Sequence, residues 1–557
     1  MKNKRNIVVL LAVLVMVSGL LAGYIKEKKR LPQNENPASQ AGDELTGTKV
    51  RFSNDINTDI LTRHALPKFE RMEAKDRKKL VDSLQVMKKI ELLQIEKAAF
   101  LYPEKNLQNT EQSIASLCAE DLNGEITVDF NGTRADELVE TMNANPGAVI
   151  NIISEYIELN CDIPLINNIH IIGNGVEFIC KENTNAIFGE NISNVWIDNI
   201  KMEGNAKYGI FLLGGENVRI TNCTINCMEE KAICISGKLK GFQISNNVLN
   251  ENGAGGVYLS GEVSDGLIEN NQICGNRGTS NWMAGIVMTN VVSEDRGNIW
   301  ETFDQAHHFP RKENLYGNLA CPHNIILRDN EVSHNNASGI YSDGAYNCFV
   351  IGNKVEENDK EGICLDYGTI GFYLKENIFD GNGQRIRQTD EDLRMDFVLD
   401  AGRMEDGSAK AKLPGISLDN TAYNILENNI VINNYGGGIK MVRTTVRCLI
   451  SENIVKDNNR GKNDVFHFFG IEAGAAVADV ESKDMDFTPD YENIICRNSI
   501  TGDHYSGIFV GENCYVNDIF DNVIMEPQMF AVEAISVRFN SIVNNLSNAG
   551  IRNEYRE

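Results

Sequence analysis

The 557-residue chain lacks an excess of positive charge. Lys and Arg number 53 against 78 Asp and Glu, which gives a net charge of −25 and a pI near 4.9. Nucleic acids and anionic membrane surfaces are themselves negative, so an acidic chain of this kind is a poor partner for either. We therefore expect no nucleic-acid partner.

The chain also lacks paired cysteine motifs. Its 13 Cys residues form an odd set without a CxxC motif, and the nearest approach is Cys223 and Cys227. Many of the others, such as Cys348 and Cys448, fall at strand-like positions. Small buried hydrophobic residues are therefore the favoured interpretation over a disulfide framework or a metal site. The cysteine content leaves the redox compartment and the disulfide state open.

What the sequence does contain is a repeat marked by asparagine. Most steps between the marking residues are 23, 24 or 25, and three longer steps of 59, 52 and 45 each equal one period plus an insertion. A fixed period of this length indicates a solenoid, in which each repeat stacks on its neighbours. The eleven positions are Asn199, Asn222, Asn247, Asn271, Asn330, Asn353, Asn377, Asn429, Asn453, Asn498 and Asn522.

A second signal keeps the same register. Nine residues after most of these Asn residues comes Gly-Ile or Gly-Val, as at Gly339 and Gly362, and short β-branched runs lie between. Such runs between Asn and Gly turns are typical of strands. Coils would stack at about 4.8 Å, so the Asn amides of neighbouring coils would form a hydrogen-bonded ladder. The predicted fold is all-β, a right-handed, single-stranded parallel β-helix with an asparagine ladder.

With this pattern the chain resembles the pectin-lyase-like superfamily of right-handed β-helix proteins over roughly residues 125–557. The stretch Ala135 to Ile150 resembles their usual entry, a short amphipathic helix, a Pro-Gly turn and the first strand. Such a helix would cover the open N-terminal end of the stack. Members are mostly polysaccharide lyases, glycoside hydrolases and uronan epimerases, with some phage tailspikes and surface proteins. The resemblance therefore implies a polysaccharide partner.

The N-terminal part has a different character. Residues 1–30 hold an apolar run from Ile7 to Ile25 with basic residues on both sides. Nineteen residues can just span a hydrocarbon core, and small residues near the end also suit a signal peptide. Residues 31–60 are predicted to be a linker and residues 61–124 a helical segment, because apolar residues recur at helical spacing between 65 and 100. A coiled-coil stalk or a partner-binding helix is the alternative to a helix that packs on the first coils, and we favour packing because the heptads are too few. We expect the protein to be membrane-anchored at the cell surface or secreted.

Insertions interrupt the repeat near residues 291–320, between Asn377 and Gly415, and on both sides of Gly470. All of them flank the strand that begins with Gly-Ile, on coils that are close in the stack. Insertions in solenoids map to one face and often build its binding surface. We therefore expect them to form walls around a groove.

Three Asp residues occupy one position on successive coils beside these insertions. If the first and third residues after Gly face the core, the second and fourth face outward. The fourth position is Asp343, Asp366 and Asp419 in turn, so neighbours would lie about 5 Å apart and the outer two about 10 Å apart. Carboxylates this close repel, and at least one must bind a proton or share a cation. Asp also suits a strand-ending turn, as in Asp343-Gly344, but this accounts for one Asp better than for three.

The resemblance implies two chemistries for the three Asp residues. In the β-helical pectate lyases stacked Asp residues bind Ca²⁺, and a Lys or Arg removes a proton for β-elimination. That assignment makes Asp343, Asp366 and Asp419 possible Ca²⁺ ligands, with Lys440 or Arg443 as the base.

In the polygalacturonase-like hydrolases two Asp residues act as general acid and base on a glycosidic bond. Their Asn-Thr-Asp, Asp-Asp, Gly-His-Gly and Arg-Ile-Lys signatures are missing from this chain, and only Gly438-Ile439-Lys440 echoes the last. We therefore expect Ca²⁺-assisted β-elimination of a uronate-containing polysaccharide, with hydrolysis by paired Asp residues as the alternative. A surface β-helix that binds glycan without cleaving it is a third possibility.

Several other side chains are candidates for contact with substrate. His residues in a loop are often ordinary surface residues, and aromatic residues also stack along a β-helix without any ligand. Trp300 and Tyr258 would stack on sugar rings. The remaining candidates are Tyr341, Tyr367, His307, His308, Arg311 and Glu472.

Overall fold

The computed structural model describes twelve stretches of the chain, all within the unit formed by residues 57–557. The predicted apolar segment at 7–25 and the predicted helix at 65–100 lie outside them. Within the described stretches no helix is long and apolar enough to cross a bilayer. The described residues are 102–118, 126–180, 185–289, 321–366, 368–384, 413–442, 445–462, 468–474, 490–511, 514–515, 517–535 and 540–553.

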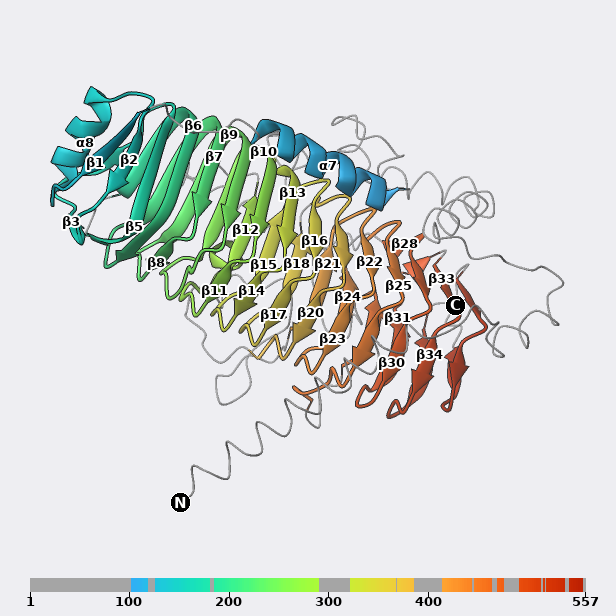
Figure 1. Ribbon diagram of the computed structural model, residues 1–557. Helices are drawn as coiled ribbons and strands as arrows, with labels where there is room; N and C mark the ends of the chain where they lie inside the picture. Colours follow the sequence, from blue (N-terminus) through green and yellow to red (C-terminus); the bar gives the residue numbers. More distant parts are fainter. Residues whose placement is uncertain are drawn as a thin grey trace, which may run out of the picture. The chain divides into compact units, whose positions relative to one another are not determined.

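The chain winds into coils whose strands pair in parallel with those of the coils before and after (Figure 1). Three strand positions recur in each full coil, and we call the resulting stacks the first, second and third faces. The first face holds the Gly-Ile strands, and the ladder Asn residues separate the second face from the third. The predicted parallel β-helix is confirmed.

Long strands continue from one face to the next in the early coils. They are β5 (Ile169–Ile179), β6 (Asn185–Glu203), β7 (Tyr208–Thr221), β9 (Lys231–Ser245) and β10 (Val257–Glu269). The other strands of the first face are β4 (Ile163–Pro164), β12 (Ile286–Thr289), β15 (Ile340–Asp343), β18 (Ile363–Asp366), β21 (Ile416–Asp419), β24 (Ile439–Val442), β27 (Ile471–Ala473), β31 (Ser506–Val510), β35 (Phe530–Ala534) and β38 (Ile551–Asn553).

The later coils have separate, shorter strands on the other two faces. The second face contains β1 (Thr127–Phe130), β2 (Val149–Ile152), β13 (His323–Arg328), β16 (Phe349–Ile351), β19 (Tyr373–Lys375), β22 (Ile425–Glu427), β25 (Leu449–Ser451), β29 (Ile494–Cys496), β33 (Asp518–Phe520) and β36 (Ser541–Val543). The third face contains β3 (Tyr156–Glu158), β8 (Thr224–Asn226), β11 (Gln272–Cys274), β14 (Glu331–Ser333), β17 (Lys354–Glu356), β20 (Ile378–Asp380), β23 (Ile430–Ile432), β26 (Ile454–Lys456), β30 (Ser499–Thr501), β34 (Val523–Met525) and β37 (Leu546–Ser547). Two bridging strands, β28 (Asp490–Tyr491) and β32 (Cys514–Tyr515), pair at the turn between the first and second faces.

The predicted asparagine ladder runs from Asn247 to Asn522 and continues to Asn545. Each Nδ2 donates to Oδ1 of the next coil's Asn, for example from Asn353 to Asn377 at 3.1 Å. The three long steps are hydrogen-bonded neighbours in the same way, which confirms that each is one coil with an insertion. At the N-terminal end Asn222 instead donates to the carboxylate of Asp198.

A second ladder, which was not predicted, follows the third-face strands. Its residues lie five positions after those of the first ladder, and their amides are linked in the same way. They are Asn252, Asn276, Asn335, Asn358, Asn382, Asn434 and Asn458, and His504 ends the series.

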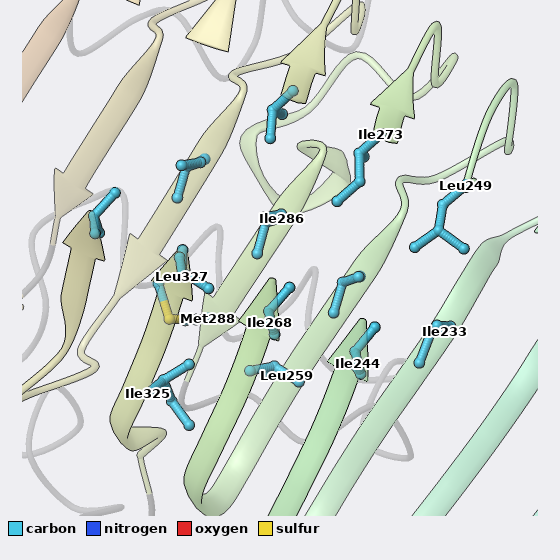
Figure 2. Close-up of a cluster of buried hydrophobic side chains, with 14 of the residues drawn as sticks. Ile233, Ile244, Leu249, Leu259, Ile268, Ile273, Ile286, Met288, Ile325 and Leu327 are labelled. Carbon is cyan, nitrogen blue, oxygen red and sulfur yellow. The ribbon is translucent and has the colours of Figure 1, made fainter. Parts of the chain in front are cut away.

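Apolar side chains of all three faces fill the interior between the ladders. Figure 2 shows part of this core, where Leu259 and Ile286 of the first face lie close to Ile268 of the second. The helix α8 (Ala135–Ala144) closes one end of the core with Leu138 and Met142, both fully buried. The predicted N-terminal cover is confirmed, although β1 precedes α8 and pairs with β2, so the strand after the helix is not the first.

One further helix, α7 (Pro103–Leu117), crosses the outer side of the second face. Its Ser113 hydroxyl donates to Asp265 at 3.1 Å, and Glu104 accepts from the Tyr373 hydroxyl at 3.0 Å. Between them Glu111 forms an ion pair with Arg328. Nine helical residues rise about 13.5 Å, close to the roughly 14 Å of three coil steps. The rise of the helix therefore matches the spacing of the coils that it crosses.

Candidate acidic site on the first face

The predicted alternation on the first face is confirmed by two separate groups of buried side chains. The first and third residues after Gly, such as Ile340 and Leu365, belong to the main core. The second residues form another cluster on the outer side of the strands, which also contains Tyr208 and Ala284. Its strand members are Cys234, Tyr258, Val287, Tyr341 and Cys364. The outer side of these coils is therefore largely shielded from water.

The three Asp residues end three successive strands at the outer side of this face. Asp343 is the register partner of Asp366, and the pairing of Leu365 with Leu418 places Asp419 next in the column. Their exposed fractions are 6%, 6% and 2%. Strand spacing puts successive members about 4.8 Å apart at the backbone. The structure thus brings together three carboxyl groups with little access to solvent.

Hydrogen bonds from the preceding coil and from its own turn reach Asp366 in the middle of this column. The Tyr341 hydroxyl donates to Oδ2 of Asp366 at 3.5 Å, the long limit of such a bond. The Thr369 hydroxyl donates to the main-chain carbonyl of Asp366 at 2.7 Å. The turn that follows Asp366 is therefore fixed by its own side chain–backbone bond. Tyr341, predicted to contact substrate, is thus in contact with the acidic column.

Two further predicted residues lie on the next coils. Lys440 is the register partner of Ser417, and Glu472 is the register partner of Lys440. The Lys440 ammonium lies 3.7 Å from the Glu472 carboxylate. The ion pair therefore joins these two coils next to the Asp column.

The structure adds one acidic residue that was not predicted. Asp490 in β28 is buried, and burial is the main reason that its pKa is raised to about 7, with contributions from Asp419 and Glu472. Thr369, Thr421 and Thr445 occupy the same turn in earlier coils. Each of these residues lies eight positions before a residue of the first ladder, so counting back from Asn498 would have found Asp490.

The remaining predicted residues lie outside the described part of the chain. They are Tyr367, Arg443, Trp300, His307, His308 and Arg311. The insertion near residues 291–320 lies outside it as well, and so do residues 385–412, 463–467 and 475–489 of the other insertions. The described residues contain no group of three or more His, Cys, Asp or Glu side chains that could hold a metal ion.

Comparison with known proteins agrees with this fold. The profile of the right-handed β-helix region matches residues 185–379 and 319–484. No curated protein matches the sequence.

Several solved structures are similar to the chain. The A-module of mannuronan C-5 epimerase AlgE6 from Azotobacter vinelandii shares 13% identity, over 80% of this chain and 99% of that one, with a TM-score of 0.38. The catalytic unit of GH87 α-1,3-glucanase from Streptomyces thermodiastaticus shares 10% identity, over 77% and 68% of the two chains, with a TM-score of 0.43. The surface adhesin PfbA of Streptococcus pneumoniae shares 10% identity, over 72% and 88%, with a TM-score of 0.38. At these identities the likeness concerns the fold alone.

Proposed function

Since the chain belongs to the right-handed β-helix family of the pectin-lyase-like superfamily, we propose that it is a carbohydrate-active protein that cleaves a polysaccharide at the acidic column of its first face. The observation that carries this proposal is the column itself. Asp343, Asp366 and Asp419 stack in register, buried, on the coils next to the insertions. Repulsion between the carboxylates makes such an arrangement costly. If these residues served only to form the turns, Asp on three successive coils would bring no advantage.

Hydrolysis by a pair of carboxyl groups is the chemistry that the geometry supports best. A glycosidase needs one protonated and one ionised carboxyl group, and close stacking favours a shared proton of this kind. The backbone spacing of about 4.8 Å between neighbouring strands is close to the carboxyl separation of about 5 Å that is typical of retaining enzymes. A hydroxyl donor stabilises an ionised partner, so Tyr341 favours Asp366 as the nucleophile or base. Asp343, its register partner, is then the general acid.

Calcium-assisted β-elimination of a uronate is the second candidate. The position of Lys440 next to Ser417, one coil beyond Asp419, favours it, because a base there would face a substrate that lies along the column. The Glu472 carboxylate 3.7 Å away opposes it, because the ion pair directs the Lys440 amine toward Glu472 and not toward a substrate. Calcium would supply the charge that acidifies the proton next to the uronate carboxyl group.

An assay of the purified full chain against a panel of neutral and uronate-containing polysaccharides separates these chemistries. New reducing ends that form equally with calcium or a chelator indicate hydrolysis. Unsaturated products that absorb in the ultraviolet and need calcium indicate elimination. Binding without either product would leave a glycan-binding surface protein and contradict cleavage.

Asp366→Asn tests the site itself, because it keeps the shape and removes one charge. We expect at least a 100-fold loss of cleavage, in line with the loss of a general acid or base, and slightly higher thermal stability because repulsion is relieved. Asp380→Asn on the third face is the matched control and should cleave normally. A stable Asp366→Asn protein with unchanged activity would overturn the site.

We also propose that the acidic repeat domain acts outside the cell, since residues 7–25 suit an anchor or an export signal. Membrane fractionation and N-terminal sequencing of the protein from its native host would test this. Recovery of an intact N-terminus in the soluble cytoplasmic fraction would contradict it.

A further inference from the structure

A buried carboxyl group lies beside the acidic column and takes no part in the chemistry proposed above. Asp490 is 2% exposed, and its Oδ1 accepts a hydrogen bond from the main-chain N–H of Thr445 at 2.6 Å. Its Oδ2 is buried and has no hydrogen-bond partner among the described residues. Burying an ionised carboxylate with an unsatisfied oxygen costs much more free energy than burying the neutral acid.

The neighbours of Asp490 in the stack are hydrogen-bond donors. Asp490 pairs with Cys514 in the next coil and contacts Thr445 in the preceding one. The Thr445 hydroxyl donates to the carbonyl of Leu418 at 2.9 Å, and the Cys514 thiol donates to the carbonyl of Ala473 at 2.9 Å. An ionised Asp has no proton to donate, so only its acid form matches the chemistry of this turn.

The charges that face Asp490 act in the same direction. Asp419 on β21 and Glu472 on β27 both disfavour a negative charge there, in addition to the larger effect of burial, while main-chain N–H groups favour the anion. Cys514 on β32 is a thiol whose own pKa is raised by burial. The ion pair of Lys440 on β24 is directed to Glu472. None of the ion pairs among the described residues includes Asp490.

We infer that Asp490 is a positioning residue of the acidic site, whose buried carboxyl keeps a proton so that Asp419 and Glu472 stay ionised. If Asp490 loses this proton, three carboxylates face one another, and the added negative charge raises the proton affinity of Asp419 and Glu472. Asp419 is the neighbour of Asp366 in the column, so the change would disturb the division between acid and base there. The effect on catalysis rests on the proposed function, whereas the location of the proton does not.

Infrared difference spectra of the full chain, recorded between about pH 5 and pH 9, test where the proton is held. A protonated carboxyl group has its own C=O band, and we expect one such band to titrate near pH 7. It should vanish in Asp490→Asn, which keeps the shape and a permanent donor, and in Asp490→Thr, which copies Thr445. It should persist in the control Asp380→Asn. A band that remains in both Asp490 variants would overturn the inference.

Stability gives a second readout that needs no substrate. A carboxyl group with a raised pKa stabilises the fold most below its ordinary range, and this stabilisation is lost as pH rises through about 7. The wild type should therefore lose more stability than Asp490→Asn between about pH 5 and pH 8. Equal losses in the two proteins would contradict the inference.

The activity profile separates the two proposals. If the protein cleaves a polysaccharide, Asp490→Asn should flatten the alkaline fall of kcat/KM that the wild type shows. Should no variant cleave anything, the infrared band still decides where the proton is held. Cleavage together with a band unaffected by either Asp490 substitution would keep the proposed function and reject the role of Asp490.

Discussion

In the middle coils, glycine before the first-face strands is required by space rather than by backbone conformation. A Cβ atom built on Gly362 would lie 2.7 Å from the carbonyl oxygen of Gly415 and 3.0 Å from Nδ2 of Asn382. Gly339 meets Gly362 and Asn358 in the same way. The Gly-Ile repeat is therefore the counterpart of the second asparagine ladder, because each Gly makes room for an Asn amide and for the next coil.

Gly362→Ala should consequently destabilise the fold although alanine is a small residue. The nearest contacts are backbone and ring atoms, which move only with the coil, so we expect a loss of about 1–3 kcal/mol. Gly550→Ala is the matched control, since nothing lies within 4 Å of its Cβ position. Denaturant unfolding measures both. Equal midpoints for the two variants would show that the stack accommodates the methyl group.

At the scale of single residues the sequence predicted the Asp column well, because a strict repeat turns residue number into position. Asp343 and Asp366 are register partners as their spacing required. The contact of Tyr341 with Asp366 could not be predicted from the repeat, because it depends on the length and direction of one side chain. Asp490 was missed because its coil is interrupted by an insertion, so its alignment with Thr445 needs the ladder as a reference.

The ladders are the elements that tie one coil to the next, and the second one ends on a different residue type. The main-chain N–H of Asn458 donates to Nε2 of His504 at 3.1 Å. This bond needs a neutral imidazole, since a protonated ring has no free lone pair. Burial lowers the pKa of His504 to about 4, and Asp457 and Asp503 oppose this shift only weakly.

The C-terminal coils should therefore become less stable as the pH falls. A His whose folded pKa is depressed stabilises the fold above about pH 6.5, and this is lost as pH falls toward 4. The full loss is about 3 kcal/mol. His504→Asn should extend the ladder by one Asn and remove this part of the pH dependence. Thermal unfolding at about pH 7.5 and pH 5 compares the two proteins, and an unchanged pH dependence in His504→Asn would contradict the role of the ring.

At the level of elements, the repeat predicted the strands and the ladder of each coil, but it did not predict the structure of the insertions between coils. The first ladder and the short strands follow from spacing alone, because every coil must offer the same hydrogen bonds to its neighbours. The second ladder could have been predicted from the sequence in the same way, because its Asn residues follow those of the first by five positions. Other Asn residues nearby obscure this spacing. The insertions escape such reasoning since nothing in the period constrains them.

For the whole molecule the stack is a series of nearest-neighbour contacts, and α7 is the described element that crosses many of them. Such a series opens most easily at its ends and at poorly coupled coils. Contacts of α7 reach from Gly241, beside Leu117, to Tyr373, beside Glu104. The helix should therefore make the middle coils open together rather than one by one.

Undocking α7 tests this coupling. Leu107 and Ile114 are its buried apolar residues, so Leu107→Asp combined with Ile114→Asp removes the packing face, whereas Ala115→Asp adds a charge on the exposed side of the same helix. Hydrogen exchange followed by mass spectrometry should show at least tenfold faster exchange in β13, β16 and β19, about 1.4 kcal/mol per factor of ten. The strands β1 and β2, far from α7 in the stack, should exchange as before, and so should every coil of Ala115→Asp. Unchanged exchange of the middle coils in the double variant would contradict this role of α7. It would mean that the strand pairing, the ladders and the core already provide all of the coupling between these coils.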